Sequence, residues 1–178
     1  PAVRATPPQY VDLSAIAKGY GVDAVARFLE SEGIEAYLVE IGGEVRVNGR
    51  KPDGSTWRLA IEQPVSEGRE VNRVVALESR AMATSGDYRN YYESEGRRYS
   101  HTIDPETGKP IAHRLASVTV IADDCMTADA LATGFNVMGY EQANELAVRE
   151  NIPAYFIVRT EEGFEPHQTP AFSSYVTQ

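Results

Sequence analysis

The sequence LASVTVIADDCMTADALATG occupies residues 115–134. Its first seven residues are rich in β-branched side chains, which predicts a strand over 115–121. An acidic turn follows, and residues 125–138 have the pattern of a helix. Asp129 and Thr133 are four residues apart, so they lie on one face of that helix. We expect the rest of the chain to be organised around this strand–turn–helix unit.

Asp129 and Thr133 together have the chemistry of a metal site. A carboxylate and a hydroxyl near a helix start present two hard oxygens to one point, and Mg²⁺ prefers oxygen ligands while keeping places for phosphate. A structural interpretation is also open, in which Thr133 bonds back to a carbonyl and Asp129 interacts with the helix N-terminus. On this pair alone the structural interpretation is the simpler one.

The composition is that of an ordinary globular protein, and 178 residues fit one domain, 1–178. The formal net charge is -9, and an acidic chain without a basic run is a poor candidate for binding nucleic acid or an anionic membrane. An anionic substrate would need a local cation, a metal ion or backbone amides. The single cysteine, Cys125, excludes an internal disulfide, and no apolar run is long enough to span a bilayer.

Helical and strand patterns elsewhere in the chain predict an α+β fold. A helical stripe of apolar residues ends at Gly33, and another helix is expected after Gly139. Short apolar segments bounded by turn residues predict strands at 36–41, 44–48, 57–61, 73–78, 81–84, 115–121, 154–158 and 164–168. We therefore expect a mostly antiparallel sheet, laid out as a meander after the first helix and packed with helices.

Residues near the first helix and the first turn are candidates for binding an anion. Lys18 lies among small residues, where a ligand can approach the backbone closely, so it suits a phosphate or a polar ring edge, although a solvated cation is commoner. Gly42 and Gly43 separate two expected strands and either turn the chain or offer N–H groups to an anion. Asp12 precedes the first helix, where capping is the simplest explanation.

The segment HTIDPETGKP, residues 101–110, has the chemistry of a tight turn. His101 and Asp104 therefore lie where a strand enters a loop, a frequent place for functional residues. A histidine there can be a general base, a hydrogen-bond donor to phosphate or a structural tie to the backbone. The residues alone favour the structural tie.

Five segments together resemble the ApbE family, the FAD:protein FMN transferases, in order and spacing. They are DLSAIAKGY (12–20), IGGE (41–44), TSGDY (84–88), HTIDPETGKP (101–110) and TADALAT (127–133). The resemblance spans essentially the whole chain but only the C-terminal half or more of a typical member. We therefore expect an ApbE-like flavin transferase core that lacks the usual N-terminal region.

The resemblance implies a Mg²⁺-dependent enzyme that takes FAD as its substrate. Such an enzyme transfers FMN to a Thr or Ser hydroxyl of a partner flavoprotein and releases AMP. By position, Asp129, Thr133 and the carbonyl of Ala15 resemble the Mg²⁺ ligands. His101 is similar to the catalytic histidine of the family, and Asp104 nearby is expected to help it act on the acceptor hydroxyl.

The resemblance also implies where FAD is bound and which partner is modified. Asp12, Lys18 and Ile103 match positions that contact FAD, and Gly42 and Gly43 belong to the same expected site. The acceptor would be a respiratory quinone reductase or an electron-transfer subunit that carries a Thr/Ser flavinylation motif. The implied location is the periplasm, with a lipid anchor to the inner membrane in the full-length form.

Two alternatives to the transferase remain open. A Mg²⁺-dependent FAD pyrophosphatase would pass the phosphoryl group to water and release free FMN and AMP. A non-catalytic flavin-binding module would be stabilised by its ligand without releasing AMP, and this second alternative applies if the chain is a fragment.

Overall fold

The computed structural model describes residues 11–65, 68–86, 91–94 and 97–177. The helices and strands are α1 (Ser14–Ser31), β1 (Tyr37–Ile41), β2 (Glu44–Asn48), β3 (Trp57–Glu62), β4 (Val71–Leu77), β5 (Arg80–Gly86), β6 (Tyr91–Ser94), β7 (Arg97–Ser100), β8 (Leu115–Ala122), α2 (Cys125–Met138), α3 (Tyr140–Arg149), β9 (Ala154–Thr160), β10 (Gly163–Gln168) and the short 3₁₀ helix η1 (Pro170–Tyr175).

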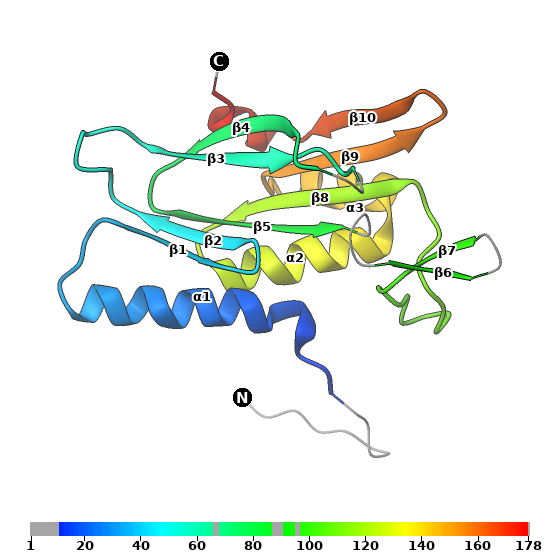
Figure 1. The fold of residues 1–178 in the computed structure, drawn as a ribbon, viewed down its shortest axis with the longest axis horizontal. Coiled ribbons are helices and arrows are strands. Elements are labelled where there is room, and N and C mark those ends of the chain that lie inside the picture. Colours follow the sequence, from blue (N-terminus) through cyan, green and yellow to red (C-terminus); the bar gives the residue numbers. More distant parts are fainter. Residues whose placement is uncertain (1–10, 66–67, 87–90, 95–96, 178) are drawn as a thin grey trace.

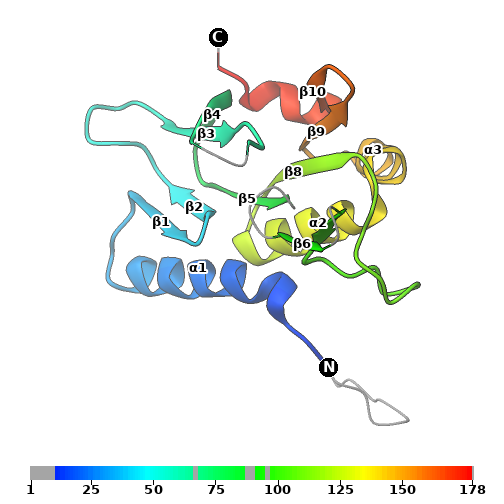
Figure 2. The ribbon, with the colours of Figure 1, turned by 45° about the vertical axis from the view of Figure 1, so that its right-hand side comes forward.

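A six-stranded sheet forms the middle of the fold, in the order β1-β2-β5-β8-β9-β10, and all its neighbouring strands are antiparallel. Helices α1, α2 and α3 lie along one face of this sheet, and the β3–β4 hairpin and η1 lie on the other side (Figures 1 and 2). The predicted fold class, a mostly antiparallel α+β fold with packed helices, is confirmed.

The two faces of β8 and β9 explain why their sequences are apolar almost throughout. Val118 and Phe156 pack against α2 and α3, whereas Ile121 and Tyr155 belong to a second cluster with the β3–β4 hairpin and η1. Because successive side chains of a strand point to opposite faces, a strand covered on both sides needs apolar residues at every position. Seven of the eight residues of β8 are buried, as this arrangement requires.

The predicted meander is wrong at one point. Strands β3 and β4 do not continue the main sheet but pair with each other, and the chain then returns so that β5 pairs with β2. The reason lies in packing, since Ile61 of β3 and Val75 of β4 are buried against Tyr155 and Phe172 on the second face of the sheet. A local alternating pattern predicts a strand but cannot tell which partner the strand will choose.

Helix α2 begins and ends where the sequence predicts. Asp124 caps its N-terminus, because its Oδ1 accepts the N–H of Thr127 at 2.8 Å, and Gly139 follows its last residue with a φ of 79°. The expected strand at 154–158 is longer by two residues, and Phe172 of η1 is fully buried.

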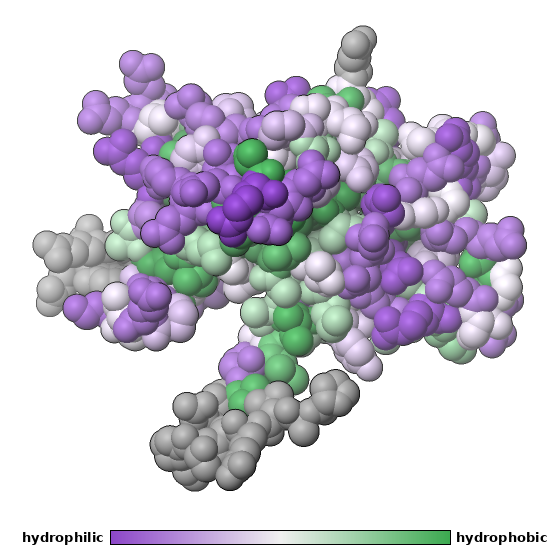
Figure 3. All heavy atoms as spheres, turned by 180° about the vertical axis from the view of Figure 1, so that it is seen from behind, coloured by the Kyte–Doolittle hydropathy of each residue, from purple (hydrophilic) through white to green (hydrophobic). Residues whose placement is uncertain are grey.

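The surface is polar over its outer parts, and apolar residues gather toward the middle of the face seen from behind (Figure 3). None of the helices in the described ranges is both long enough and apolar enough to cross a membrane.

Candidate functional site

A cleft of about 1370 Å³ opens where the start of α1, the β1–β2 turn, β3, β5, the loop at 101–105 and one face of α2 meet. It brings together most of the residues that the sequence singles out. The predicted site residues in its lining are Asp12, Ala15, Lys18, Gly42, Gly43, His101, Ile103, Asp129 and Thr133. Asp104 is not among the described residues that line it.

Asp129 and Thr133 lie one turn apart on α2, and Asp129 is only 5% exposed. Oδ2 of Asp129 accepts the backbone N–H of Gly19 at 2.9 Å. In a regular α-helix the N–H of Gly19 points toward the carbonyl of Ala15, four residues earlier. The carboxylate from α2 and this carbonyl from α1 therefore lie on the same side of Gly19. Asp129, Thr133 and Ala15 all line one cleft, and the oxygens these residues offer, a carboxylate, a hydroxyl and a backbone carbonyl, are of the kind that fits Mg²⁺.

The electrostatics of Asp129 also favour a cation. Burial raises the pKa of Asp129 above its ordinary value, against the lowering by the Gly19 N–H and the Lys18 ammonium. A divalent cation in the cleft would stabilise the ionised carboxylate. Within the described ranges, no group of three or more His, Cys, Asp or Glu side chains could hold a metal ion. The oxygens that accompany Asp129 on the wall of the cleft include those of Thr133 and Ala15.

Lys18 is paired with a buried carboxylate instead of extending freely into the cleft. Its Nζ lies 2.6 Å from Oε1 of Glu44, whose side chain is 2% exposed, while that of Lys18 is 48% exposed. Burial raises the pKa of Glu44, Lys18 lowers it, and the charge of Asp129 raises it. The second oxygen, Oε2, is buried without a hydrogen-bond partner among the described residues. Glu44 thus contributes negative charge and an unused acceptor to the wall of the cleft.

Gly42 and Gly43 form the two-residue turn between β1 and β2, with φ values of 64° and 106°. Both values lie in the left-handed region, which explains why glycine is needed at each position. The N–H of Gly43 donates to Oε1 of Glu40 at 3.0 Å, so this N–H already has a partner. A Cβ on Gly42 would lie 3.2 Å from Cδ of Lys18, so this glycine leaves room for the lysine to pass.

The loop that carries His101 and Ile103 is held by its own hydrogen bonds. His101 is exposed and Ile103 is 49% exposed, and both line the cleft. Asp104 instead serves the loop, because Oδ1 accepts the N–H of Glu106 and Oδ2 accepts the hydroxyl of Thr107, each at 2.9 Å. These bonds lower the pKa of Asp104. The structure therefore gives Asp104 a role in shaping the loop.

Asp12 lies at the entrance of α1 and also lines the cleft. Its Oδ1 accepts the N–H of Ser14 at 2.6 Å, and hydrogen bonding to Ser14 lowers the pKa of Asp12. The residue at the N-cap position is Leu13, which has no side-chain cap. Asp12 thus stabilises the helix start and remains exposed where it lines the cleft.

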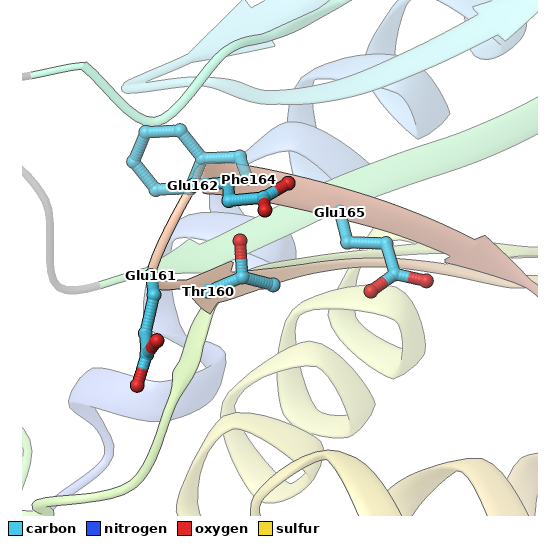
Figure 4. Close-up of a pocket in the computed structure, with 5 residues that line it drawn as sticks. All are labelled: Thr160, Glu161, Glu162, Phe164 and Glu165. Carbon is cyan, nitrogen blue, oxygen red and sulfur yellow. The ribbon is translucent and has the colours of Figure 1, made fainter.

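A smaller hollow of about 580 Å³ lies at the β9–β10 hairpin. Its lining consists of Thr160, Glu161, Glu162, Phe164 and Glu165, none of which lines the cleft. The side chains of Glu161 and Glu165 point away from one another (Figure 4). These carboxylates do not converge on one point, so the cleft is the better candidate for a functional site.

Sequence reasoning missed two buried carboxylates. Glu44 is the last residue of the IGGE segment, and Asp23 lies within the first helix, but the sequence patterns predict no role for either. Asp23 is 2% exposed and accepts the backbone N–H groups of Cys125 and Met126, at 3.0 and 2.9 Å. The contact of Glu44 with Lys18 and that of Asp23 with the start of α2 both join residues far apart in sequence. The local pattern of a helix or strand does not predict such contacts.

The last two residues of the TSGDY segment, Asp87 and Tyr88, lie outside the described residues.

Comparison with known protein families gives one match over most of the chain. The family model described as the ApbE family matches residues 2–156. An FAD:protein FMN transferase of Vibrio cholerae serotype O1 is 52% identical over 172 residues, which cover 97% of this chain and 52% of that protein. An FAD:protein FMN transferase of Haemophilus influenzae is 50% identical over 170 residues, which cover 95% of this chain and 49% of that protein.

Solved structures agree with the fold. The flavin transferase ApbE from Vibrio cholerae superposes with a TM-score of 0.84 at 51% identity, covering 94% of this chain and 53% of that one. The apo form of the flavinyl transferase ApbE from Pseudomonas stutzeri gives a TM-score of 0.82 at 49% identity, covering 93% of this chain and 51% of that one. The chain spans about half the length of the curated relatives it matches.

Proposed function

The chain belongs to the ApbE family. We propose that it acts as an FAD:protein FMN transferase and that it carries the residues that bind the metal ion and the residue that acts on the acceptor hydroxyl. The proposed reaction moves FMN from FAD to a Thr or Ser hydroxyl of a partner flavoprotein and releases AMP. The observation that carries the proposal is the meeting of Asp129, Thr133 and Ala15 with His101 in one cleft. The names of the relatives, which are flavin transferases, support it.

Asp129, Thr133 and the carbonyl of Ala15 would hold Mg²⁺. A bound Mg²⁺ would neutralise charge that develops on the pyrophosphate during transfer. Lys18 and Glu44 form a nearly neutral pair next to these residues, so Lys18 alone would not balance the phosphates. The acidic cleft therefore depends on a metal ion to accept an anionic substrate.

His101 is the candidate general base. In the proposed step, the acceptor hydroxyl oxygen bonds to the phosphorus on the riboflavin side of FAD, and the bond from that phosphorus to the bridging oxygen breaks. The bridging oxygen leaves with AMP, and the hydroxyl proton passes to a ring nitrogen of His101. Ile103, which is half exposed in the same loop, would contact the substrate beside the pyrophosphate.

The test is the intact mass of a Thr-containing acceptor domain after incubation with this chain, FAD and Mg²⁺. We expect a gain of one FMN that disappears in EDTA and with Asp129→Ala. If this chain shows no transfer, the same assay is repeated on a chain extended at its N-terminus to the length of the relatives. Transfer by the extended chain alone would show that the added segment is required. An Asp129→Ala protein with full activity would contradict the proposal.

The assay also separates the two alternatives. Free FMN and AMP produced without an acceptor domain would favour a pyrophosphatase. FAD that raises the melting temperature without any release of AMP would favour a flavin-binding module. We further propose a periplasmic location with a lipid anchor in the full-length form, from the resemblance alone, which cell fractionation of the full-length protein tests.

A further inference from the structure

Helices α1 and α2 are joined by two buried carboxylates, one from each helix. Asp129 of α2 accepts the N–H of Gly19 on α1, while Asp23 of α1 accepts the N–H groups of Cys125 and Met126 on α2. Each helix therefore supplies one buried acceptor to the backbone of the other. Asp23 follows Gly19 by four residues, and Asp129 follows Cys125 by four, so the two sets of bonds lie about one helical turn apart.

We propose that Asp23 is a positioning residue that holds Asp129 against the Ala15 carbonyl and thereby determines the affinity of the cleft for its metal ion. This inference rests on the proposed function, because it takes Asp129 and Ala15 as metal ligands. Asp23 itself does not line the cleft in the described part of the chain. Its effect passes through the placement of α2.

The bonding of Asp23 leaves it little freedom. Oδ1 accepts from Cys125 at 3.0 Å and from Nη1 of Arg46 at 2.9 Å, and Oδ2 accepts from Met126 at 2.9 Å. The side chain is 2% exposed, so the arginine supplies the opposite charge that a buried carboxylate requires. Arg46 belongs to β2, and the network therefore fixes α1, α2 and the sheet relative to one another.

Two separate carboxylates serve the first turn of α2, and they do different work. Asp124 is the N-cap, and its oxygens accept the N–H and the hydroxyl of Thr127. These bonds stabilise α2 without reaching α1. Asp23 accepts the N–H groups of the two preceding residues, Cys125 and Met126. Unlike Asp124, it therefore joins α2 to α1, the helix that holds Ala15.

This difference provides a matched pair of variants. Asp23→Asn keeps the shape of the side chain but replaces one acceptor oxygen with an NH₂ group, which must then face an N–H or a guanidinium. Asp124→Ala removes the N-cap and weakens the same helix end from its exposed side. If Asp23 contributed only to the stability of α2, the two variants would have the same effect on metal binding.

The experiment measures Mn²⁺ binding by electron paramagnetic resonance, with Mn²⁺ as an oxygen-preferring probe, together with melting temperature in EDTA. The proteins are the 178-residue chain, Asp23→Asn, Asp124→Ala and Asp129→Asn. We expect both Asp23→Asn and Asp124→Ala to lower the melting temperature. Of these two, only Asp23→Asn should also weaken Mn²⁺ binding, by on the order of 10-fold, as for other groups that orient metal ligands.

Equal Mn²⁺ affinity in the chain and in Asp23→Asn overturns the inference and leaves the metal site standing. An equal loss in Asp124→Ala overturns it as well, because the effect would then follow helix stability. A chain that binds no Mn²⁺, or binds it as well with Asp129→Asn, overturns the metal site and this inference with it. If Asp23→Asn does not fold, Arg46→Gln decides, since it should weaken Mn²⁺ binding by a smaller factor in the same direction.

Discussion

Gly19 and Asp129 join α1 and α2 directly, because the N–H of Gly19 donates to Oδ2 of Asp129 at 2.9 Å. A Cβ at position 19 would lie 2.4 Å from the carbonyl oxygen of Cys125 and 2.8 Å from Cβ of Asp129. The first of these atoms belongs to the backbone, which cannot turn aside. The absence of a side chain at Gly19 is therefore what allows the proposed metal ligand to reach the other helix.

Gly19→Ala should push the two helices apart. We expect the free energy of unfolding to fall by about 1–3 kcal/mol, as for other overpacked sites, and Mn²⁺ binding to weaken because Asp129 moves away from Ala15. Urea denaturation and Mn²⁺ titration measure the two effects.

Gly134→Ala is the matched control for that substitution, because no heavy atom lies within 4 Å of a Cβ at this position of α2. It should raise stability by about 0.4–1 kcal/mol, since alanine favours the helix. A Gly19→Ala protein that is as stable as the Gly134→Ala protein would show that the helices can separate at no cost.

Asp129 should make the metal-free protein less stable as the pH rises. Its pKa is raised by burial, so the unfolded chain ionises first and stability is lost as the pH rises through the unfolded and then the folded pKa. Asp129→Asn removes this loss. We expect the variant in EDTA to melt at a higher temperature than the parent near neutral pH, with the difference shrinking in acid.

Mg²⁺ provides the control for the titration of Asp129. It should raise the melting temperature of the parent and leave that of Asp129→Asn nearly unchanged, because the variant lacks the charged ligand. A parent protein that is more stable than Asp129→Asn at every pH in EDTA would contradict this account of the carboxylate.

The sequence predicts those parts of the fold that are determined locally. Helix α2 and strand β8 were predicted with nearly their observed bounds because the apolar pattern, the acidic turn between them and Gly139 all agree. The position of the β3–β4 hairpin was not predictable in the same way. Its residues alternate like any strand, and its place depends on burial against Tyr155 and Phe172, which lie about 100 residues further along.

The site shows the same division. Its exposed residues lie in short segments that the sequence already marks, such as the loop with His101, and nine of the predicted site residues line one cleft. The partners of Lys18 and of the α2 N-terminus were not foreseen. Glu44 and Asp23 act through contacts across 26 and 102 residues of sequence, and nothing local distinguishes them from ordinary surface acids.

Lys18 and Glu44 should be strongly coupled in stability. Lys18→Met leaves the buried Glu44 carboxylate without its partner, so we expect a loss of about 1–3 kcal/mol in the free energy of unfolding at neutral pH. The double variant Lys18→Met/Glu44→Gln carries no charge at this pair and should regain most of that loss. Urea denaturation of the FAD-free proteins measures the cycle, and simple additivity of the two substitutions would show that the pair is not coupled.

Substitutions at Asp104 and Thr107 test whether the Asp104 carboxylate orients His101 or only maintains the conformation of the loop. Asp104→Ala removes the acceptor for Glu106 and Thr107, and Thr107→Val removes one of these bonds. Because a loosened loop misplaces His101 and Ile103, we expect both variants to lower kcat, Asp104→Ala somewhat more than Thr107→Val, by about fivefold for each 1 kcal/mol of lost loop stability. The pH profile of kcat should keep its shape. A carboxylate that orients His101 would instead make Asp104→Ala alone severe, by about 10²–10⁴-fold, and would shift the profile.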